Sequence, residues 1–398
     1  MDASQRRVVV TLGFCGLVSA ADNWFVSPAL PAIAQTLAVM PSVAAVVLTA
    51  YLVPYGMLQP VCGAIGDRVG RQRLLRIIVL GLAISTVICA AAPTLPLLVA
   101  ARILTGCFAA GIISVSQALV GDVVPAEGRA GAVGLLMGIT FTGQGLSAGL
   151  GGIITDLMGW RAAFVSFGVL GLLAWVGLLR LRGVTEALPP AGERRSPAAE
   201  ARDFLARAGR LFFVRGRAIY LTACSTGIIY LGVYGFMGTF LSERCGLSST
   251  AAGLLMMFYG IACLVGGTIS GRIGARGGLL RVIQVGEVSG LCAVILLAAS
   301  ALTGSWVPAL GAAACLGLGY ILVQPTLVSL SMDVDPSQTG LCTGLIGLGV
   351  FAGGGVGSVL GQLAIGAGGY LALWACAGAA LVAQAVLSTR ALARRGRA

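Results

Sequence analysis

The sequence GAIGDRVGRQR, residues 63–73, is a short glycine-rich and charged segment between two long apolar runs. Its glycines permit a tight turn with closely packed backbone. Its aspartate can accept hydrogen bonds from the positive N-terminal end of a helix, and its arginines can pair with carboxylates. The related sequence GTISGRIG, residues 267–274, occupies the same place in the second half of the chain. A sequence repeat of this kind predicts two structurally similar halves.

Two more pairs of short segments support this internal repeat. The sequence DVVP at 122–125 is echoed by DVDP at 333–336, and Gly-Trp at 159–160 is echoed by Gly-Tyr at 369–370. Equivalent segments in equivalent loops predict a parallel repeat of six helices, an arrangement in which two halves rock about a central site.

The composition predicts an all-α integral membrane protein. Of the 398 residues, 58% are hydrophobic and 10% are charged, whereas soluble domains are about a quarter charged. A spanning helix needs about 20 mostly apolar residues, and the 60 glycines suit close helix packing in lipid. Twelve apolar stretches can be marked, at residues 8–30, 44–65, 74–92, 95–120, 131–157, 162–181, 218–241, 251–269, 279–302, 307–331, 340–365 and 370–387.

The only long polar stretch, residues 182–217, divides these runs into six and six. We therefore expect twelve transmembrane helices in two pseudo-symmetric six-helix bundles, residues 1–181 and 218–398, joined by a cytoplasmic linker at 182–217.

The arginines predict the orientation in the membrane. All 26 basic residues are arginines, and 23 of them fall in the termini and in the loops on the same side as the termini. This bias places both termini in the cytoplasm. A signal peptide cleaved near residues 18–20 is the alternative, but its removal would reverse the bias of every later loop. The arginine-only basic set and the short loops suggest a bacterial inner membrane.

Several other function classes are disfavoured. The net charge of +12 reflects membrane topology rather than nucleic-acid binding. The 11 cysteines stand singly, without a Cys-x-x-Cys pair, and there is no histidine. We therefore expect no metal site, no cofactor and no enzyme chemistry, and we expect a monomer.

The motif Gly63-x-x-Gly66-Asp67-Arg68-x-Gly70-Arg71-x-Arg73 resembles the signature loop of the major facilitator superfamily. The resemblance implies a conformational latch, in which Asp67 docks near residues 337–340 at the start of the eleventh helix and Arg71 pairs with Asp122. An ordinary solvated loop is the alternative. Since Gly271 stands at the equivalent of Asp67 in the second half, the latch should exist on one side only. The latch residues are Gly63, Gly66, Asp67, Arg68, Gly70, Arg71 and Asp122.

Two further segments resemble the drug–proton antiporters of this superfamily. They are Asp22-Asn23-x-x-x-x-Pro28-Ala29-Leu30-Pro31, closing the first span, and Arg102-x-x-x-Gly106 in the fourth. The fifth span departs from the antiporter pattern, because Ser147-Ala148 replaces the Gly-Pro that would kink it. The resemblance implies proton-coupled efflux of a drug or metabolite.

Three ionisable residues lie deep in apolar stretches, where charge is costly. At about 1.5 Å per residue, Asp22 and Arg102 reach the same depth, so we expect them to meet. Burial favours a protonated carboxyl group and a nearby arginine favours a charged one, which predicts Asp22 as a protonation site with Arg102 as its switchable partner. A permanent structural ion pair is the alternative. Glu287 is expected to extend toward the cytoplasmic interface, near Arg281.

Aromatic and amide side chains on helices expected to line the central cavity are candidates for substrate contact, although helix packing and interfacial anchoring are equally compatible with them. They are Asn23, Trp24, Tyr51, Tyr55, Gln59, Gln117, Tyr230, Tyr234, Phe236, Tyr259 and Gln324. We predict a secondary active transporter whose partners are a small molecule, protons and membrane lipid. The alternatives are export of a sugar or metal chelator, uptake by proton symport, and lipid flipping.

Overall fold

The computed structural model describes residues 2–181, 197–335 and 338–395, and these residues form helices and no strand. The helices of the first half are α1 (Ala3–Trp24), α2 (Val26–Thr36), α3 (Pro41–Ala44), α4 (Val46–Val69), α5 (Arg71–Ala90), α6 (Leu95–Ala109), α7 (Ile112–Val123), α8 (Ala126–Met158) and α9 (Trp160–Arg180).

The second half contains α-helices and short π-helical turns. They are α10 (Pro197–Arg210), η1 (Leu211–Arg215), α11 (Arg217–Thr226), η2 (Gly227–Leu231), α12 (Gly232–Cys245), α13 (Ser249–Thr303), α14 (Val307–Met332), α15 (Thr339–Gly347), η4 (Leu348–Ala352) and α16 (Gly353–Arg395).

The helices account for all twelve predicted stretches. Within the described residues, nine helices are long and apolar enough to cross a membrane, or ten when α1 and α2 are counted as one bent span. The long helix α13 is broken at Gly278, and α16 is broken at Gly368 and Gly369. The 33-residue α8 covers the stretch predicted at 131–157. Each stretch thus falls on one helix, on two or three consecutive helical segments, or on one arm of a broken helix, which confirms the all-helical membrane fold.

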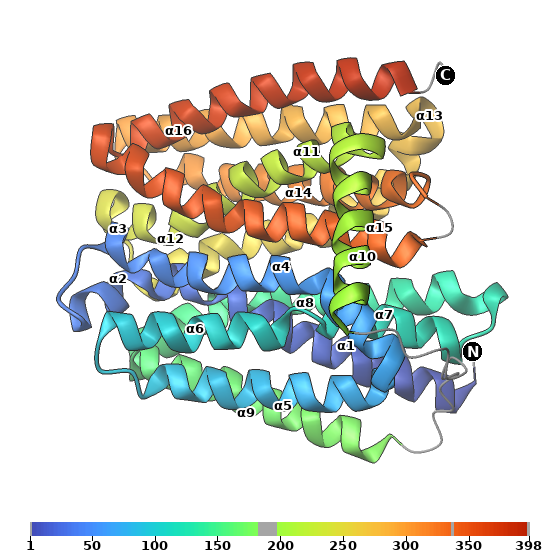
Figure 1. The fold of residues 1–398 in the computed structure, drawn as a ribbon. Coiled ribbons are helices and arrows are strands. Elements are labelled where there is room, and N and C mark those ends of the chain that lie inside the picture. The colour runs from blue at the N-terminus through green and yellow to red at the C-terminus, as the bar shows by residue number, and fades with distance from the viewer. Residues whose placement is uncertain (1, 182–196, 336–337, 396–398) are drawn as a thin grey trace.

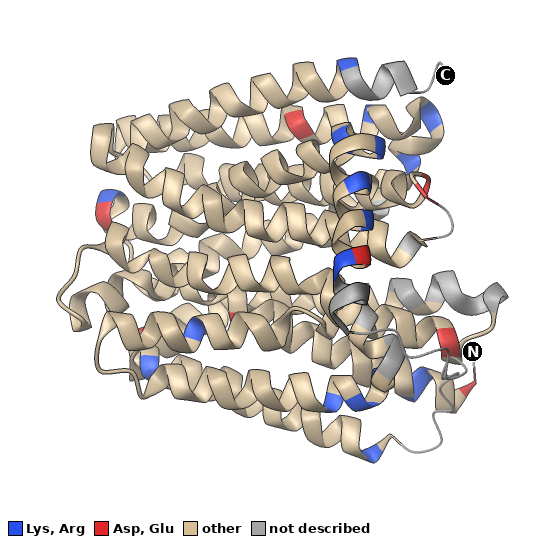
Figure 2. Cartoon of the chain, viewed as in Figure 1, with Lys and Arg blue, Asp and Glu red and all other residues tan. Residues whose placement is uncertain are grey.

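The two halves of the chain lie side by side in Figure 1, with α1 and α4–α9 in the lower part, α11–α16 in the upper part, and α2 and α3 reaching up beside α12. Both chain ends lie at the same end of the bundle, and most of the described arginines gather there (Figure 2). In the described part of the predicted linker, residues 197–217, α10 forms and runs across the other helices.

Helix α8 packs against α13 across the contact between the halves, and its glycines explain how closely the two helices approach. Gly143 lies against the backbone of Leu17 on α1, whereas Gly145 lies against Gly260 and Gly152 against Ser249, both on α13. The glycines therefore form two faces, one for each half. Helices surrounded by lipid gain little from hydrophobic association, so close backbone packing of this kind stabilises their contacts.

Candidate functional site

A buried ion pair joins α1 and α6 inside the first half. Arg102 Nη1 lies 2.7 Å from Asp22 Oδ2, and the two side chains are 0% and 1% exposed. The Thr86 hydroxyl on α5 donates to Asp22 Oδ1 at 2.8 Å. Both carboxylate oxygens are therefore engaged. The predicted contact between Asp22 and Arg102 is confirmed, while its part in proton coupling stays a prediction.

Aromatic rings enclose the guanidinium group. It lies 4.3 Å from the centre of the Tyr51 ring and 5.7 Å from that of Phe164, distances at which a cation is attracted by the ring faces. The Tyr51 hydroxyl donates to the carbonyl oxygen of Ser19 at 3.2 Å. In this conformation Tyr51 is thus part of the wall around the ion pair, and substrate contact by Tyr51 stays a prediction.

The first span breaks immediately after the ion pair. Helix α1 ends at Trp24, and α2 continues from Val26 at an angle of 44°. On α2, the Ser27 hydroxyl donates to the carbonyl oxygens of Tyr234 and Gly235 at 3.1 and 2.9 Å, and its oxygen accepts from the N–H of Gly238 at 3.3 Å. These partners belong to the second half, so α2 is attached to one half and Asp22 to the other.

An aromatic cluster joins the halves next to this break. The ring centre of Trp24 lies 4.2 Å from that of Tyr234 and 4.7 Å from that of Tyr259, and the two tyrosine rings are 4.6 Å apart. A cavity of about 20 Å³ beside them is lined by Asn23. A drug-sized ligand needs a pocket of ~300 Å³ or more. The sequence therefore predicted the right neighbours, but in this conformation their rings fill the space between them.

The other predicted pocket residues divide between the interface and the interior of one half. Tyr55 and Gln59 face the second half, where they lie against Phe351 and Gly347. Gln117 donates to the sulfur of Met137 within the first half. Substrate contact by these residues also stays a prediction.

Besides Tyr234 and Tyr259, three more of the predicted residues lie on helices of the second half. The Tyr230 hydroxyl donates to the carbonyl oxygen of Gly286 at 2.9 Å, and Phe236 packs on Gly361. Gln324 is half-buried on α14. Sequence reasoning missed Tyr320, whose ring centre lies 6.2 Å from that of Tyr259 and 6.4 Å from that of Tyr230. Tyr320 has no distinguishing neighbours in the sequence, so only the fold identifies it.

A second tie between the halves was also missed by sequence reasoning. Near the end of α8, the carboxylate of Asp156 accepts from the backbone N–H groups of Ser249 and Thr250 at 3.1 and 2.6 Å. These groups form the first turn of α13, where the helix dipole favours negative charge. Nearer the chain ends, an added Cβ at Gly138 or Gly267 would meet no described atom within 4 Å. Helices α8 and α13 are thus tied at the end far from the termini, whereas no described atom lies close to these two glycines.

One of the two contacts predicted for the latch is present, and its role as a latch stays a prediction. Arg71 forms an ion pair with Asp122 and also donates to the carbonyl oxygen of Ala118 at 3.0 Å. Gly70 stands at the turn between α4 and α5 with φ 92°, a conformation that glycine adopts without strain. The side chains of Asp67 and Arg68, together with residues 336–337, lie outside the described part of the chain. The contact expected for Asp67 therefore stays a prediction.

The expectation for Glu287 was wrong. Its side chain is 2% exposed and lies inside the second half instead of extending toward Arg281. Glu287 Oε1 accepts from the Ser388 hydroxyl at 2.8 Å and from Gln384 Nε2 at 3.3 Å, both on α16. These hydrogen bonds hold the carboxyl group between α13 and α16. Among the described residues, no cluster of three or more metal-ligating side chains was found.

Comparison with known families identifies the architecture. The sequence model of the Major Facilitator Superfamily matches residues 12–358. The chain belongs to this superfamily. Its members are transporters and not enzymes.

Similar members of the superfamily include bacterial transporters and exporters. The chain is 28% identical to the MFS-type transporter YwfA of Bacillus subtilis over 294 residues, covering 72% of this chain and 69% of YwfA. It is 29% identical to the drug efflux pump JefA of Mycobacterium tuberculosis over 191 residues, which cover 48% of this chain and 37% of that pump. The crystal structure of a D-xylose–proton symporter has the same fold, with a TM-score of 0.76 at 16% identity over 96% of both chains.

Proposed function

We propose that this protein is a secondary active transporter that exports a small organic molecule in exchange for protons, with Asp22 as the proton-binding group. The observation that carries the proposal is the position of the ion pair. Asp22 and Arg102 are held inside one half, while Ser27, five residues after Asp22, is bonded to the other half across the break in the first span.

The coupling follows from that geometry. When the halves rock apart on the side far from the termini, α2 must either leave the second half or pull on the end of α1. A pull on α1 moves Asp22 away from Arg102. The freed carboxylate loses its strongest counter-charge and binds a proton at Oδ2, in place of the Arg102 N–H. Return of the halves restores the Arg102 contact and releases the proton.

The substrate class follows from the residues at the interface. Trp24, Tyr234 and Tyr259 supply large apolar faces, and Asn23 supplies an amide beside them. A few polar groups on an apolar surface suit a lipophilic or amphipathic molecule. Separation of the halves would part the rings and open a site between them.

The direction and the membrane are part of the same proposal. Similarity to a drug efflux pump supports export. The arginines gathered at the end of the bundle that carries both termini support a cytoplasmic location for that end. For a bacterial protein, this topology corresponds to the inner membrane.

The test is proton movement in liposomes that contain purified protein, a pH dye inside, and drugs, sugars, metal chelators or metabolites outside. The wild type should show compound-dependent proton flux, and Asp22→Asn should lose it. The matched control is Glu243→Gln, which removes an exposed carboxylate at the far end of the bundle and should leave flux intact. Because Asp22→Asn leaves Arg102 unpaired, the double variant Asp22→Asn/Arg102→Gln is measured as well.

The outcomes separate the alternatives. Unchanged proton stoichiometry in either Asp22 variant would exclude Asp22 as the coupling group. Proton flux driven only by a sugar would indicate sugar transport instead of drug export. Proton movement in the same direction as the substrate would indicate symport. Substrate movement without protons in the wild type would indicate facilitated diffusion.

A further inference from the structure

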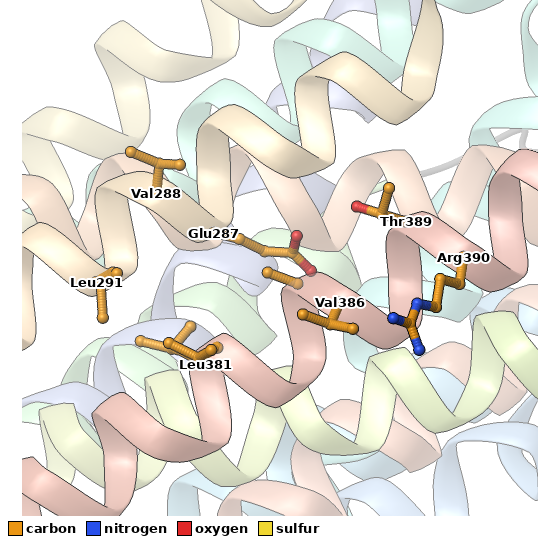
Figure 3. A pocket seen from close by; sticks show the side chains of 9 residues that line it. Glu287, Val288, Leu291, Leu381, Val386, Thr389 and Arg390 are labelled. Carbon is orange, nitrogen blue, oxygen red and sulfur yellow. The ribbon is translucent and has the colours of Figure 1, made fainter.

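A groove runs between α13 and α16 on the outer face of the second half. It has a volume of about 450 Å³, and its walls include Val288, Leu291, Val382 and Val386 (Figure 3). Val288 is 61% exposed and Val382 is 51% exposed. Valine side chains exposed to this extent on spanning helices face the lipid, so the groove opens sideways into the bilayer.

The floor of this apolar groove holds a carboxyl group. Glu287 lines the groove, yet its side chain is almost fully buried. Its Oε1 accepts from Ser388 and Gln384, whereas Oε2 is buried and has no hydrogen-bond partner among the described residues. An unpartnered carboxyl oxygen in hydrocarbon costs several kcal/mol. Such residues in membrane proteins are usually functional.

A polar network fixes the orientation of this carboxyl group. Gln384 Nε2 also donates to Thr226 Oγ1 at 3.2 Å, and Gln384 Oε1 accepts from the Ser225 hydroxyl at 2.7 Å. The network connects α11, α13 and α16. It holds Oε1 toward the interior of the second half, which leaves the buried Oε2 as the carboxyl oxygen without a partner among the described residues.

We propose that this groove binds a lipophilic amine that enters from the bilayer, with its ammonium group donating to Glu287 Oε2. The described residues provide no ion pair for Glu287, so a cationic donor supplies the missing charge and the missing hydrogen bond together. Arg390 lies on one side of Glu287, and Leu291 and Leu381 lie on the other (Figure 3). Repulsion from Arg390 orients the ligand with its apolar tail along the two leucines.

This site is separate from the central one. It lies on the outer face of the second half, while the Asp22–Arg102 pair lies inside the first half. The inference therefore does not depend on proton coupling by Asp22. It adds a lateral binding site for amphiphilic amines dissolved in the membrane.

The test uses two fluorescent probes that differ in one group: N-dansyl-1,12-diaminododecane, which ends in a primary amine, and N-dodecyl dansylamide, which lacks it. Each is titrated into phosphatidylcholine nanodiscs with and without the purified protein. The amine probe should give a saturable increase in dansyl emission that depends on the protein. Its affinity should fall at least tenfold in Glu287→Gln, since a charge-assisted hydrogen bond is lost.

Two further variants keep the test decisive. Val386→Trp fills the groove and keeps the carboxyl group of Glu287, and it should also weaken binding. Glu243→Gln removes a carboxylate elsewhere in the second half and should not. Equal affinity of the amine probe for wild type and Glu287→Gln would overturn the proposal. Equal saturable binding of the two probes would also overturn it, and would make the groove a site for a lipid chain.

Discussion

At the scale of single residues, the Asp22–Arg102 pair has opposite consequences for folding and for transport. Two charges buried together cost little more than an apolar pair, but a single charge left behind is severely destabilising. The pair is therefore stable as long as both partners stay together. The same property makes a proton on Asp22 energetically significant, because it leaves Arg102 without its counter-charge.

This asymmetry predicts the stability of variants. Asp22→Asn should lower the free energy of unfolding by about 3–5 kcal/mol, since Arg102 stays charged and buried. Asp22→Asn/Arg102→Gln should recover most of that loss. Thermal unfolding of the purified proteins in detergent measures both. A double variant that is less stable than the single variant would contradict the account of the pair as mutually compensating charges.

The sequence was sufficient to predict the Asp22–Arg102 contact because helix rise converts residue number into depth, and the two residues come to the same depth. It was insufficient for Glu287. Its partners Gln384 and Ser388 are 97 and 101 residues away along the chain, and as ordinary polar residues in an apolar run they carry no signal of their own.

At the scale of helices, the cap that Asp156 places on α13 is a contact between halves. It uses two backbone N–H groups that would otherwise lack partners at the start of a helix. A carboxylate at this position is stabilised by the helix dipole. The cap therefore holds the end of the bundle far from the termini closed.

Loss of this cap should be visible in hydrogen exchange. In Asp156→Ala, the peptide that contains Ser249 and Thr250 should take up deuterium faster than in the wild type, because its amides lose their acceptor. Peptides covering 234–241 should also take up deuterium faster if the closure is cooperative. The matched control is Glu243→Ala, whose carboxylate bonds to Tyr370 within the second half. Unchanged uptake at the start of α13 would show that Asp156 does not hold the two halves together there.

Helix positions follow from apolar length, and this is why each predicted stretch falls on one helix, on an arm of one, or on consecutive helical segments. The breaks do not follow from it. The bend at Phe25 has no proline at the break itself. In the π-helical turn η2, Gly227 packs against Val350 of the π-helical turn η4. These departures depend on packing between distant segments, which hydropathy does not contain.

At the scale of the whole molecule, the halves meet through backbone as well as side chains. A Cβ added to Gly260 would overlap the backbone of Gly145 on the other half, whereas one added to Gly267 on the same helix would meet no described atom within 4 Å. The contact of α8 with α13 therefore tolerates no side chain at Gly260.

A pair of alanine substitutions tests this contact. Gly260→Ala should destabilise the closed arrangement by about 1–3 kcal/mol, the usual cost of overpacking, and should slow transport. Gly267→Ala should leave the unfolding midpoint unchanged or slightly higher, since alanine is the better helix former. Equal midpoints for the two variants would show that the halves are not held by this backbone contact.

The internal repeat predicts two six-helix halves, and the charges predict that most arginines lie on one side, where Figure 2 shows most of the described ones. The state of the central site could not be predicted. Whether Trp24, Tyr234 and Tyr259 line an open space or fill it depends on how far the halves are rotated, and the same sequence must be stable in both states if it transports.

The burial of the Asp22–Arg102 pair also has an electrical consequence. With Asp22 ionised, the pair adds no net charge to the first half. Once a proton occupies the carboxylate, the charge of Arg102 is no longer balanced, and the loaded site carries one positive charge. Under the proposed mechanism, the membrane potential then acts on the loaded form and not on the empty one, by up to about 2.3 kcal/mol per 100 mV. Voltage would supply part of the driving force even where the pH is equal on both sides.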